Sequence, residues 1–71
     1  MRFRPKDVLT AADVGRRVTV RRSLDEGGTT DVIGELLSAD DEAVEVRRKD
    51  GTAIRIAREA ITAARVHPQN L

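Results

Sequence analysis

Five basic side chains are the residues of this sequence best suited to bind a ligand. They lie in two short stretches, VTVRRS and VEVRRKDGTAIRI, and they are Arg21, Arg47, Arg48, Lys49 and Arg55. Guanidinium and ammonium groups bind phosphates and carboxylates through charge-assisted hydrogen bonds. These five residues are therefore the candidates for a phosphate or partner contact.

The surrounding composition argues against a dedicated nucleic-acid surface. Thirteen Lys and Arg residues face twelve Asp and Glu residues, so the net charge is only +1. Phe3 is the single aromatic residue, and single-stranded nucleic acids are usually held by aromatic stacking as well as by charge. We therefore favour a solvated strand face with cross-strand ion pairs, such as Glu45 with Arg55. A weak electrostatic nucleic-acid binder that uses Arg21, Arg47, Arg48 and Arg55 remains an alternative.

Other site chemistries find little support. The chain has no cysteine, so thiolate catalysis and Cys-based zinc binding are excluded. His67, the only histidine, is expected at the surface rather than as a ligand. The acidic run at 40–42 is typical of a turn, and Ser23 and Ser38 have no base nearby in the sequence. Peptide grooves of SH3 domains and methyl-lysine cages both need aromatic residues. We expect no catalytic residue, no metal site and no cofactor.

The elements that must position the basic residues are short strands. From Arg16 onward the apolar residues alternate with polar ones, which is typical of half-buried strands. A capped helical turn is expected at 10–13 and ends at Gly15. A glycine-rich loop is expected at 25–30, and a second helical turn at 58–61. The predicted strands cover 16–24, 31–39, 43–49, 52–57 and 62–66.

The parity of VEVRRKDGTAIRI predicts its hairpin loop. A two-residue loop would place apolar and charged residues on the same face of the sheet, which period-two geometry penalises. A three-residue loop at 49–51 instead pairs Val46 with Ile54, and Glu45 with Arg55. Gly51 then takes the left-handed position of a type I turn followed by a bulge.

Five short strands with tight turns favour an all-β fold, a small five-stranded SH3-like barrel with a short N-terminal helical turn and a one-turn helix before the last strand. We expect an N-terminal segment at 1–15, the barrel at 16–67 and a tail at 68–71. The second strand should bend at Gly34 and be buried on both faces, with Val32 and Leu36 opposite Ile33 and Leu37. The expected core consists of Val18, Val20, Leu24, Val32, Ile33, Leu36, Leu37, Val44, Val46, Ile54, Ile56, Ile61 and Val66.

Residues 13–68 resemble a particular small module. The matching pieces are DVGRRV at 13–18, TDVIGELL at 30–37, VRRKDG at 46–51 and IAREAITAARVHP at 56–68. They resemble the SH3-like N-terminal domain of actinobacterial GNAT-type, histone-acetyltransferase-like enzymes. The resemblance implies an acetyltransferase domain as partner, but no residue that binds acetyl-CoA or catalyses the reaction can be carried over to this chain.

The sequence thus predicts a non-catalytic accessory or interaction module, the N-terminal domain of a GNAT-like acetyltransferase or a stand-alone relative of it. Its partner would be that following domain or another protein. Besides nucleic-acid binding, a homo-oligomer that pairs barrel edges, as small barrels of the Sm type do, is a further alternative. No apolar run approaches the ~20 residues of a membrane span, so a cytoplasmic location without membrane partners is expected.

Overall fold

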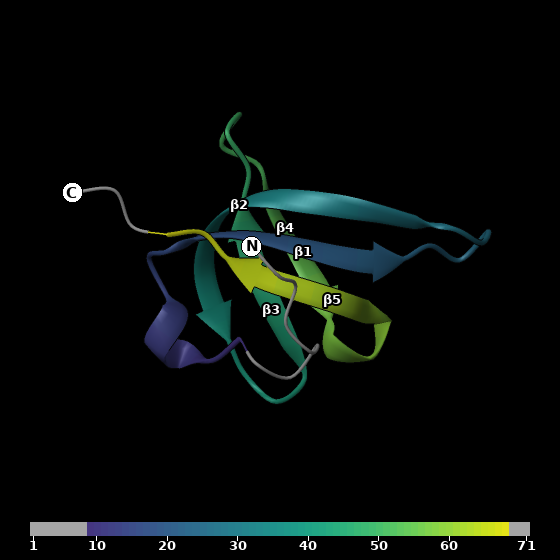
Figure 1. The fold of residues 1–71 in the computed structure, drawn as a ribbon, viewed down its shortest axis with the longest axis horizontal. Coiled ribbons are helices and arrows are strands. Elements are labelled where there is room, and N and C mark those ends of the chain that lie inside the picture. The colour runs from purple at the N-terminus through teal and green to yellow at the C-terminus, as the bar shows by residue number, and fades with distance from the viewer. Residues whose placement is uncertain (1–8, 69–71) are drawn as a thin grey trace.

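The computed structural model describes residues 9–68 and shows one antiparallel sheet of five strands. The strands are β1 (Arg17–Ser23), β2 (Thr29–Ala39), β3 (Ala43–Arg47), β4 (Ala53–Ala57) and β5 (Ile61–Val66). Two single 3-10 turns, η1 (Ala11–Asp13) and η2 (Arg58–Ala60), precede β1 and β5 (Figure 1). The order across the sheet is β4-β3-β2-β1-β5. The predicted all-β, five-stranded barrel-like fold with these two helical turns is confirmed.

The β3–β4 hairpin has the predicted register. Val44 lies opposite Ile56, Glu45 opposite Arg55 and Val46 opposite Ile54. The Arg48 N–H donates to the Thr52 carbonyl (2.8 Å) and the Gly51 N–H donates to the Arg48 carbonyl (2.9 Å), which closes a three-residue loop at 49–51. Gly51 has a φ of 93°, the left-handed conformation that glycine adopts without strain.

The β1–β2 hairpin is closed by the same pair of backbone hydrogen bonds as the β3–β4 hairpin. The Leu24 N–H donates to the Gly28 carbonyl and the Gly27 N–H donates to the Leu24 carbonyl, both at 3.0 Å. The loop is therefore only Asp25-Glu26-Gly27. Strand β2 begins at Thr29, two residues earlier than the predicted start at 31, because this tight turn lets the ladder reach Ser23 and Thr29.

The core lies on the concave side of the sheet and contains most of the predicted residues. Its buried apolar members are Leu9, Val18, Val20, Val32, Leu36, Ala43, Val44, Val46, Ile56, Ile61 and Ala64. Leu9, Ala43 and Ala64 were not predicted, because small residues and a residue outside the alternating strands carry a weak periodic signal. Leu24, Leu37, Ile54 and Val66 are only partly buried.

Strand β2 departs from the prediction at Ile33, which is 43 % exposed rather than buried. Val32 and Leu36 face the core, whereas Ile33 lies on the opposite face of the strand and points outward. The ladder to β3 has a register shift between Leu36 and Ser38. The extra residue of this bulge, Leu37, explains why the sequence shows two adjacent leucines in a strand that buries one face.

Gly34 is required because the backbone of the neighbouring hairpin passes directly over it. A Cβ atom at this position would lie 2.0 Å from the Arg47 carbonyl oxygen and 3.1 Å from the Arg48 Cα. The predicted special role of Gly34 in β2 thus has a steric cause. The contact brings the end of β3 close to β2 on the face that Gly34 shares with Val32 and Leu36.

The N-terminal segment is part of the packed structure from Leu9 onward. The Thr10 hydroxyl accepts from the Ala12 N–H (3.2 Å) and the Asp13 carboxylate accepts from the Thr10 N–H (3.0 Å), which forms the predicted capped turn. The Arg58 guanidinium donates to the Leu9 carbonyl (2.7 Å) and thereby ties this segment to η2. The first eight residues of the predicted segment and the last three of the predicted tail lie outside the described residues. No helix among residues 9–68 is long and apolar enough to cross a membrane.

Candidate functional site

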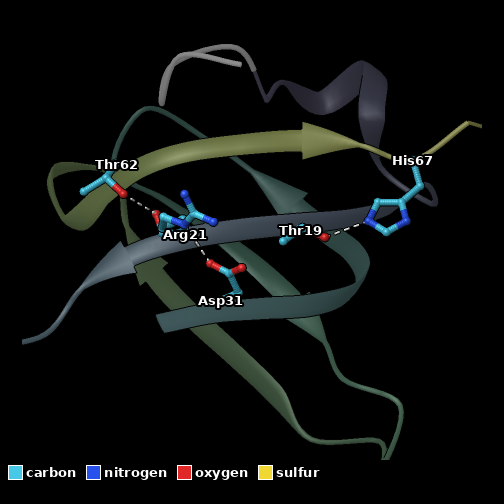
Figure 2. Close-up of polar contacts among 5 residues, drawn as sticks. All are labelled: Thr19, Arg21, Asp31, Thr62 and His67. Carbon is cyan, nitrogen blue, oxygen red and sulfur yellow. Dashed lines mark hydrogen bonds and ion pairs between the residues drawn. The ribbon is translucent and has the colours of Figure 1, made fainter. Parts of the chain in front are cut away.

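Two of the predicted basic residues are neutralised by carboxylates on the neighbouring strand. Arg21 Nε lies 3.0 Å from the Asp31 Oδ1 atom, a pair that Figure 2 shows between β1 and β2. Arg47 Nη2 lies 2.7 Å from the Glu35 Oε1 atom, between β3 and β2. These are ion pairs across the ladder, since Arg21 is registered with Asp31 and Arg47 with Glu35.

Arg55 does not form the predicted ion pair with Glu45 in the described part of the chain, although the two residues are registered across the ladder. It is exposed on β4 and lies opposite Glu45 on the outer face of the β3–β4 hairpin. Arg48 and Lys49 differ from the other three predicted residues because they lie beyond the last ladder pair of β3 and β4, where no strand residue faces them. Both are exposed, and no hydrogen bond or ion pair joins their side chains to another described residue.

A shallow depression of about 350 Å³ lies between the hairpin tip and the outer surface of β1 and β2. Its lining contains three cationic residues, two carboxylates and one apolar residue; these are Arg17, Arg48, Lys49, Asp31, Asp50 and Ile33. We call it the basic groove. The structure therefore separates Arg48 and Lys49 from Arg21, Arg47 and Arg55 and adds Arg17 to them.

Both carboxylates of the basic groove already have structural partners. Asp31 is paired with Arg21. The Asp50 carboxylate accepts from the Thr52 N–H (2.9 Å) inside the hairpin turn. Hydrogen bonds from Thr52 lower the pKa of Asp50, so it stays ionised while it holds the turn. The cations of the groove are thus the groups left available to an outside ligand.

His67 lies near the same outer surface and is more enclosed than the sequence predicts. Its Nε2 atom is 2.7 Å from the Thr19 hydroxyl, as Figure 2 shows, and the direction of this hydrogen bond depends on the tautomer of the ring. Its backbone N–H donates to the Arg17 carbonyl (2.8 Å), and its carbonyl accepts from Arg16 Nη2 (2.8 Å). His67 is thus a partly exposed residue that is hydrogen-bonded to β1, because the end of β5 packs against the start of β1.

Thr19 is the polar residue that His67 covers. It is only 2 % exposed. Burial lowers the pKa of His67, and the charges of Arg65 and Arg17 lower that pKa further. The neutral imidazole is therefore the form that suits this contact.

The acidic run at 40–42 is a turn, in agreement with the prediction. The Asp40 carboxylate accepts from the backbone N–H groups of Ala43 (2.9 Å) and Glu42 (2.8 Å). These bonds, that from Ala43 first, lower the pKa of Asp40. Within residues 9–68 no group of three or more His, Cys, Asp or Glu side chains is arranged to hold a metal ion.

The two outer strands of the sheet form a second surface with unpaired backbone groups. The bond from the Arg48 N–H to Thr52 and the bond from the Arg58 N–H to the Glu42 carbonyl show that even-numbered residues of β4 face β3. Because backbone groups alternate along a strand, those of Ala53, Arg55 and Ala57 face away from the sheet. By the same argument from the bond between His67 and Arg17, those of Ala64 and Val66 face away on β5.

These free edges were not assigned from the sequence, because strand order is not encoded in the alternation of any single strand. Ile33 and Arg17 were also not singled out as site residues. The sequence pattern gave little reason to single them out, because it predicted Ile33 as a core residue and did not distinguish Arg17 from the other basic residues.

Comparison with known proteins yields one family. The model of the family described as the Rv0428c N-terminal Sm-like domain matches residues 12–65. No curated protein and no solved structure matches the chain. The resemblance to the SH3-like domain of GNAT-type acetyltransferases is overturned by this match, which is to a different family. The motifs that carried the resemblance are structural glycines and alternating apolar residues, which small barrels of several families share.

Proposed function

The chain belongs to the Rv0428c N-terminal Sm-like domain family, and from this premise we propose that it is a non-catalytic assembly module that joins copies of itself through the edges of its sheet. The observation that carries the proposal is the strand order β4-β3-β2-β1-β5, which leaves one edge free on β4 and one on β5. This is the assembly that the sequence offered as an alternative.

The chemistry of the two edges supports pairing. A free edge presents a row of N–H and C=O groups that can extend the ladder into another chain. Proteins that avoid such pairing place Pro or charged residues, especially Lys, on their edge strands; β4 and β5 contain no Pro or Lys, and each carries a single Arg. The residues whose backbone groups face away are mostly small, with Ala53 and Ala57 on β4 and Ala64 on β5, so side chains would hinder the approach of a second strand little.

The two edges lie on different strands, so a contact between β4 of one copy and β5 of the next is heterologous. Repeated contacts of this kind close into a ring or continue as a filament, depending on the rotation between copies. The proposed function is therefore a scaffold made of several identical barrels rather than a simple two-fold dimer.

The substitution Ala57→Pro tests the proposal with little strain. Ala57 is exposed, its N–H faces away from the sheet, and its φ of −63° matches the value that the proline ring imposes. The substitution removes one edge donor and no bond within the chain. We expect assemblies of the unmodified chain in sedimentation velocity and monomers of Ala57→Pro, whereas Ala57→Ser, which keeps the N–H, should assemble normally. A monomer at the highest soluble concentration of the unmodified chain would end the proposal.

Cross-linking identifies the strands that meet. The chain has no cysteine, so single cysteines can be introduced without background. Arg55 on β4 lies opposite Glu45, and Ala63 on β5 lies opposite Arg21, so both project from the outer face. A short bismaleimide should join Arg55→Cys to Ala63→Cys in a mixture of the two variants, and should join either variant to itself poorly. Efficient linking of Arg55→Cys to itself would instead indicate a two-fold contact between β4 strands.

A further inference from the structure

The basic groove at the β3–β4 hairpin is distinct from the free edges. We propose that it binds an acidic polypeptide segment of a partner protein, with carboxylates on Arg17, Arg48 and Lys49 and an apolar side chain on Ile33. This surface has no part in the pairing of β4 with β5. It would recruit a partner to the module.

The groove is held in shape by the backbone. The end of β3 is joined to β2 by the ladder pair of Arg47 with Glu35, and the missing side chain at Gly34 lets the backbone of Arg47 and Arg48 approach closely. The hydrogen bonds of the 49–51 loop, including that from the Thr52 N–H to Asp50, fix the tip. A ligand therefore meets cations whose main chain is already placed, and little ordering cost remains for the backbone.

Charge defines the kind of ligand. The side chains of the three cationic residues that line the groove make no hydrogen bond or ion pair within the described part of the chain, whereas the Asp31 carboxylate is paired with Arg21 and the Asp50 carboxylate accepts from Thr52. The groove thus offers positive charge to an incoming anion. Carboxylates bind guanidinium groups through short, charge-assisted hydrogen bonds.

Ile33 adds an apolar contact inside the groove. Ile33 and Val14 are the two large apolar side chains that are exposed among residues 9–68, at 43 % and 45 %. Only Ile33 lies in the groove. If an apolar side chain of the ligand packed on Ile33, the contacting surfaces of both side chains would be removed from water. The combination favours a ligand that alternates acidic and apolar residues.

A nucleic acid fits this surface less well than a peptide. Asp31 and Asp50 line the groove and would repel a continuous row of phosphates, whereas a peptide can place its carboxylates away from them. The groove has no aromatic residue on which a base could stack. The two carboxylates and Ile33 thus select an acidic peptide over a polyphosphate.

The experiment uses a fluorescein-labelled peptide of alternating Asp and Leu residues as probe, with fluorescence anisotropy as readout. Two comparison peptides carry Asn in place of Asp, or Ser in place of Leu, and single-stranded oligouridylate represents nucleic acid. We expect the Asp-Leu peptide to bind more tightly than all three, and its binding to weaken as salt rises. In the labelled protein, backbone amide resonances of residues 48–50 and Ile33 should shift on binding.

Matched variants locate the contact. Arg48→Ser with Lys49→Ser should weaken binding about fivefold, since two surface charge contacts are worth about 1 kcal/mol together. Arg55→Ser, which removes an exposed cation of the same hairpin outside the groove, should change the affinity less than Arg48→Ser alone. Ile33→Ser should weaken binding and Val14→Ser should not. The affected residues are exposed, and a circular dichroism spectrum checks that each variant is folded.

Three results would overturn the proposal: equal loss in Arg48→Ser and Arg55→Ser, tighter binding of oligouridylate than of the Asp-Leu peptide, or resonance shifts confined to other residues. Ala57→Pro separates this inference from the proposed assembly. If the groove acts alone, this variant should bind the peptide with unchanged affinity, even if the unmodified chain never assembles.

Discussion

At the scale of single residues, whether a basic side chain is ion-paired or available to a ligand depends on the residue opposite it in the ladder. Arg47 and Arg48 are adjacent in sequence, yet Arg47 is paired with Glu35 while Arg48 lies past the last ladder pair. The net charge of +1 therefore hides a local surplus at one hairpin tip. Surface ion pairs contribute little stability, typically ~0–1 kcal/mol, but they decide which charges remain for a ligand.

His67 predicts a pH dependence of stability at this scale. Burial and the charges of Arg65 and Arg17 lower its pKa below the ordinary value of 6.5, and Thr19, Arg65 and Arg17 are the groups around the ring. Between the lowered pKa and 6.5 the unfolded chain binds more protons than the folded chain, so stability is complete above pH 6.5 and falls as the pH drops through this window.

Urea unfolding midpoints of the unmodified chain and His67→Gln, measured from pH 8 down to pH 5, check this prediction. The glutamine can still hydrogen-bond Thr19 but does not titrate, so its midpoint should stay level across the window. The lowered pKa values of Asp40 and Asp50 act only below their ordinary value of 3.8, outside this range. Equal slopes for the two proteins would contradict the assignment.

At the scale of elements, the two hairpins share one three-residue turn but differ in charge. Asp25-Glu26-Gly27 and Lys49-Asp50-Gly51 have the same pair of closing hydrogen bonds. The tips point in different directions, as Figure 1 shows. The β3–β4 hairpin also differs in its packing, because the backbone at its start passes so close to Gly34 of β2 that a Cβ atom there would lie 2.0 Å from the Arg47 carbonyl oxygen.

The substitution Gly34→Ala should therefore damage the packing of the whole β3–β4 hairpin on β2. The new methyl group meets backbone atoms, which cannot rotate away, so we expect a loss of about 2–3 kcal/mol in the free energy of unfolding. Gly51→Ala, at a φ of 93°, should cost about 1–2 kcal/mol through local strain. Urea denaturation measures both. A Gly34→Ala variant as stable as the unmodified chain would show that the close approach to Arg47 relaxes freely.

At the scale of the whole molecule, a small core and two free edges make stability and assembly interdependent. A chain of 71 residues buries a small apolar core and is expected to be marginally stable alone. Pairing β4 with β5 of a neighbour would stabilise the folded state by mass action. The domain is then most stable as part of an assembly.

The thermal midpoint should accordingly rise with protein concentration. A tenfold increase in concentration adds about 1.4 kcal/mol when one contact per copy is well populated, which corresponds to roughly 5 °C or more for a domain of this size. Differential scanning calorimetry over a hundredfold range of concentration measures the change. Ala57→Pro should show a constant midpoint, and a constant midpoint for the unmodified chain would argue against linked assembly.

Local patterns alone were sufficient for the fold class and for many details. The alternation of Val and Ile with charged residues predicted the strands, and its parity predicted the loop at 49–51 and the pairing of Glu45 with Arg55. The capped turn at Thr10 was also predicted, because a capping box is a signal within four residues. These features depend on neighbours in sequence, or on two strands joined by one tight turn.

The tertiary structure alone decided the features that depend on distant strands. The order β4-β3-β2-β1-β5 leaves two edges free, and it turns Ile33 outward and encloses His67 against Thr19. The absence of a side chain at Gly34 lets the end of β3 approach β2 closely, and the basic groove lies between the tip of this hairpin and residues of β1 and β2. The residue types determined which charges and apolar groups were present. Strand packing determined which of them remained unpaired, because that depends on what lies across the ladder and over each face.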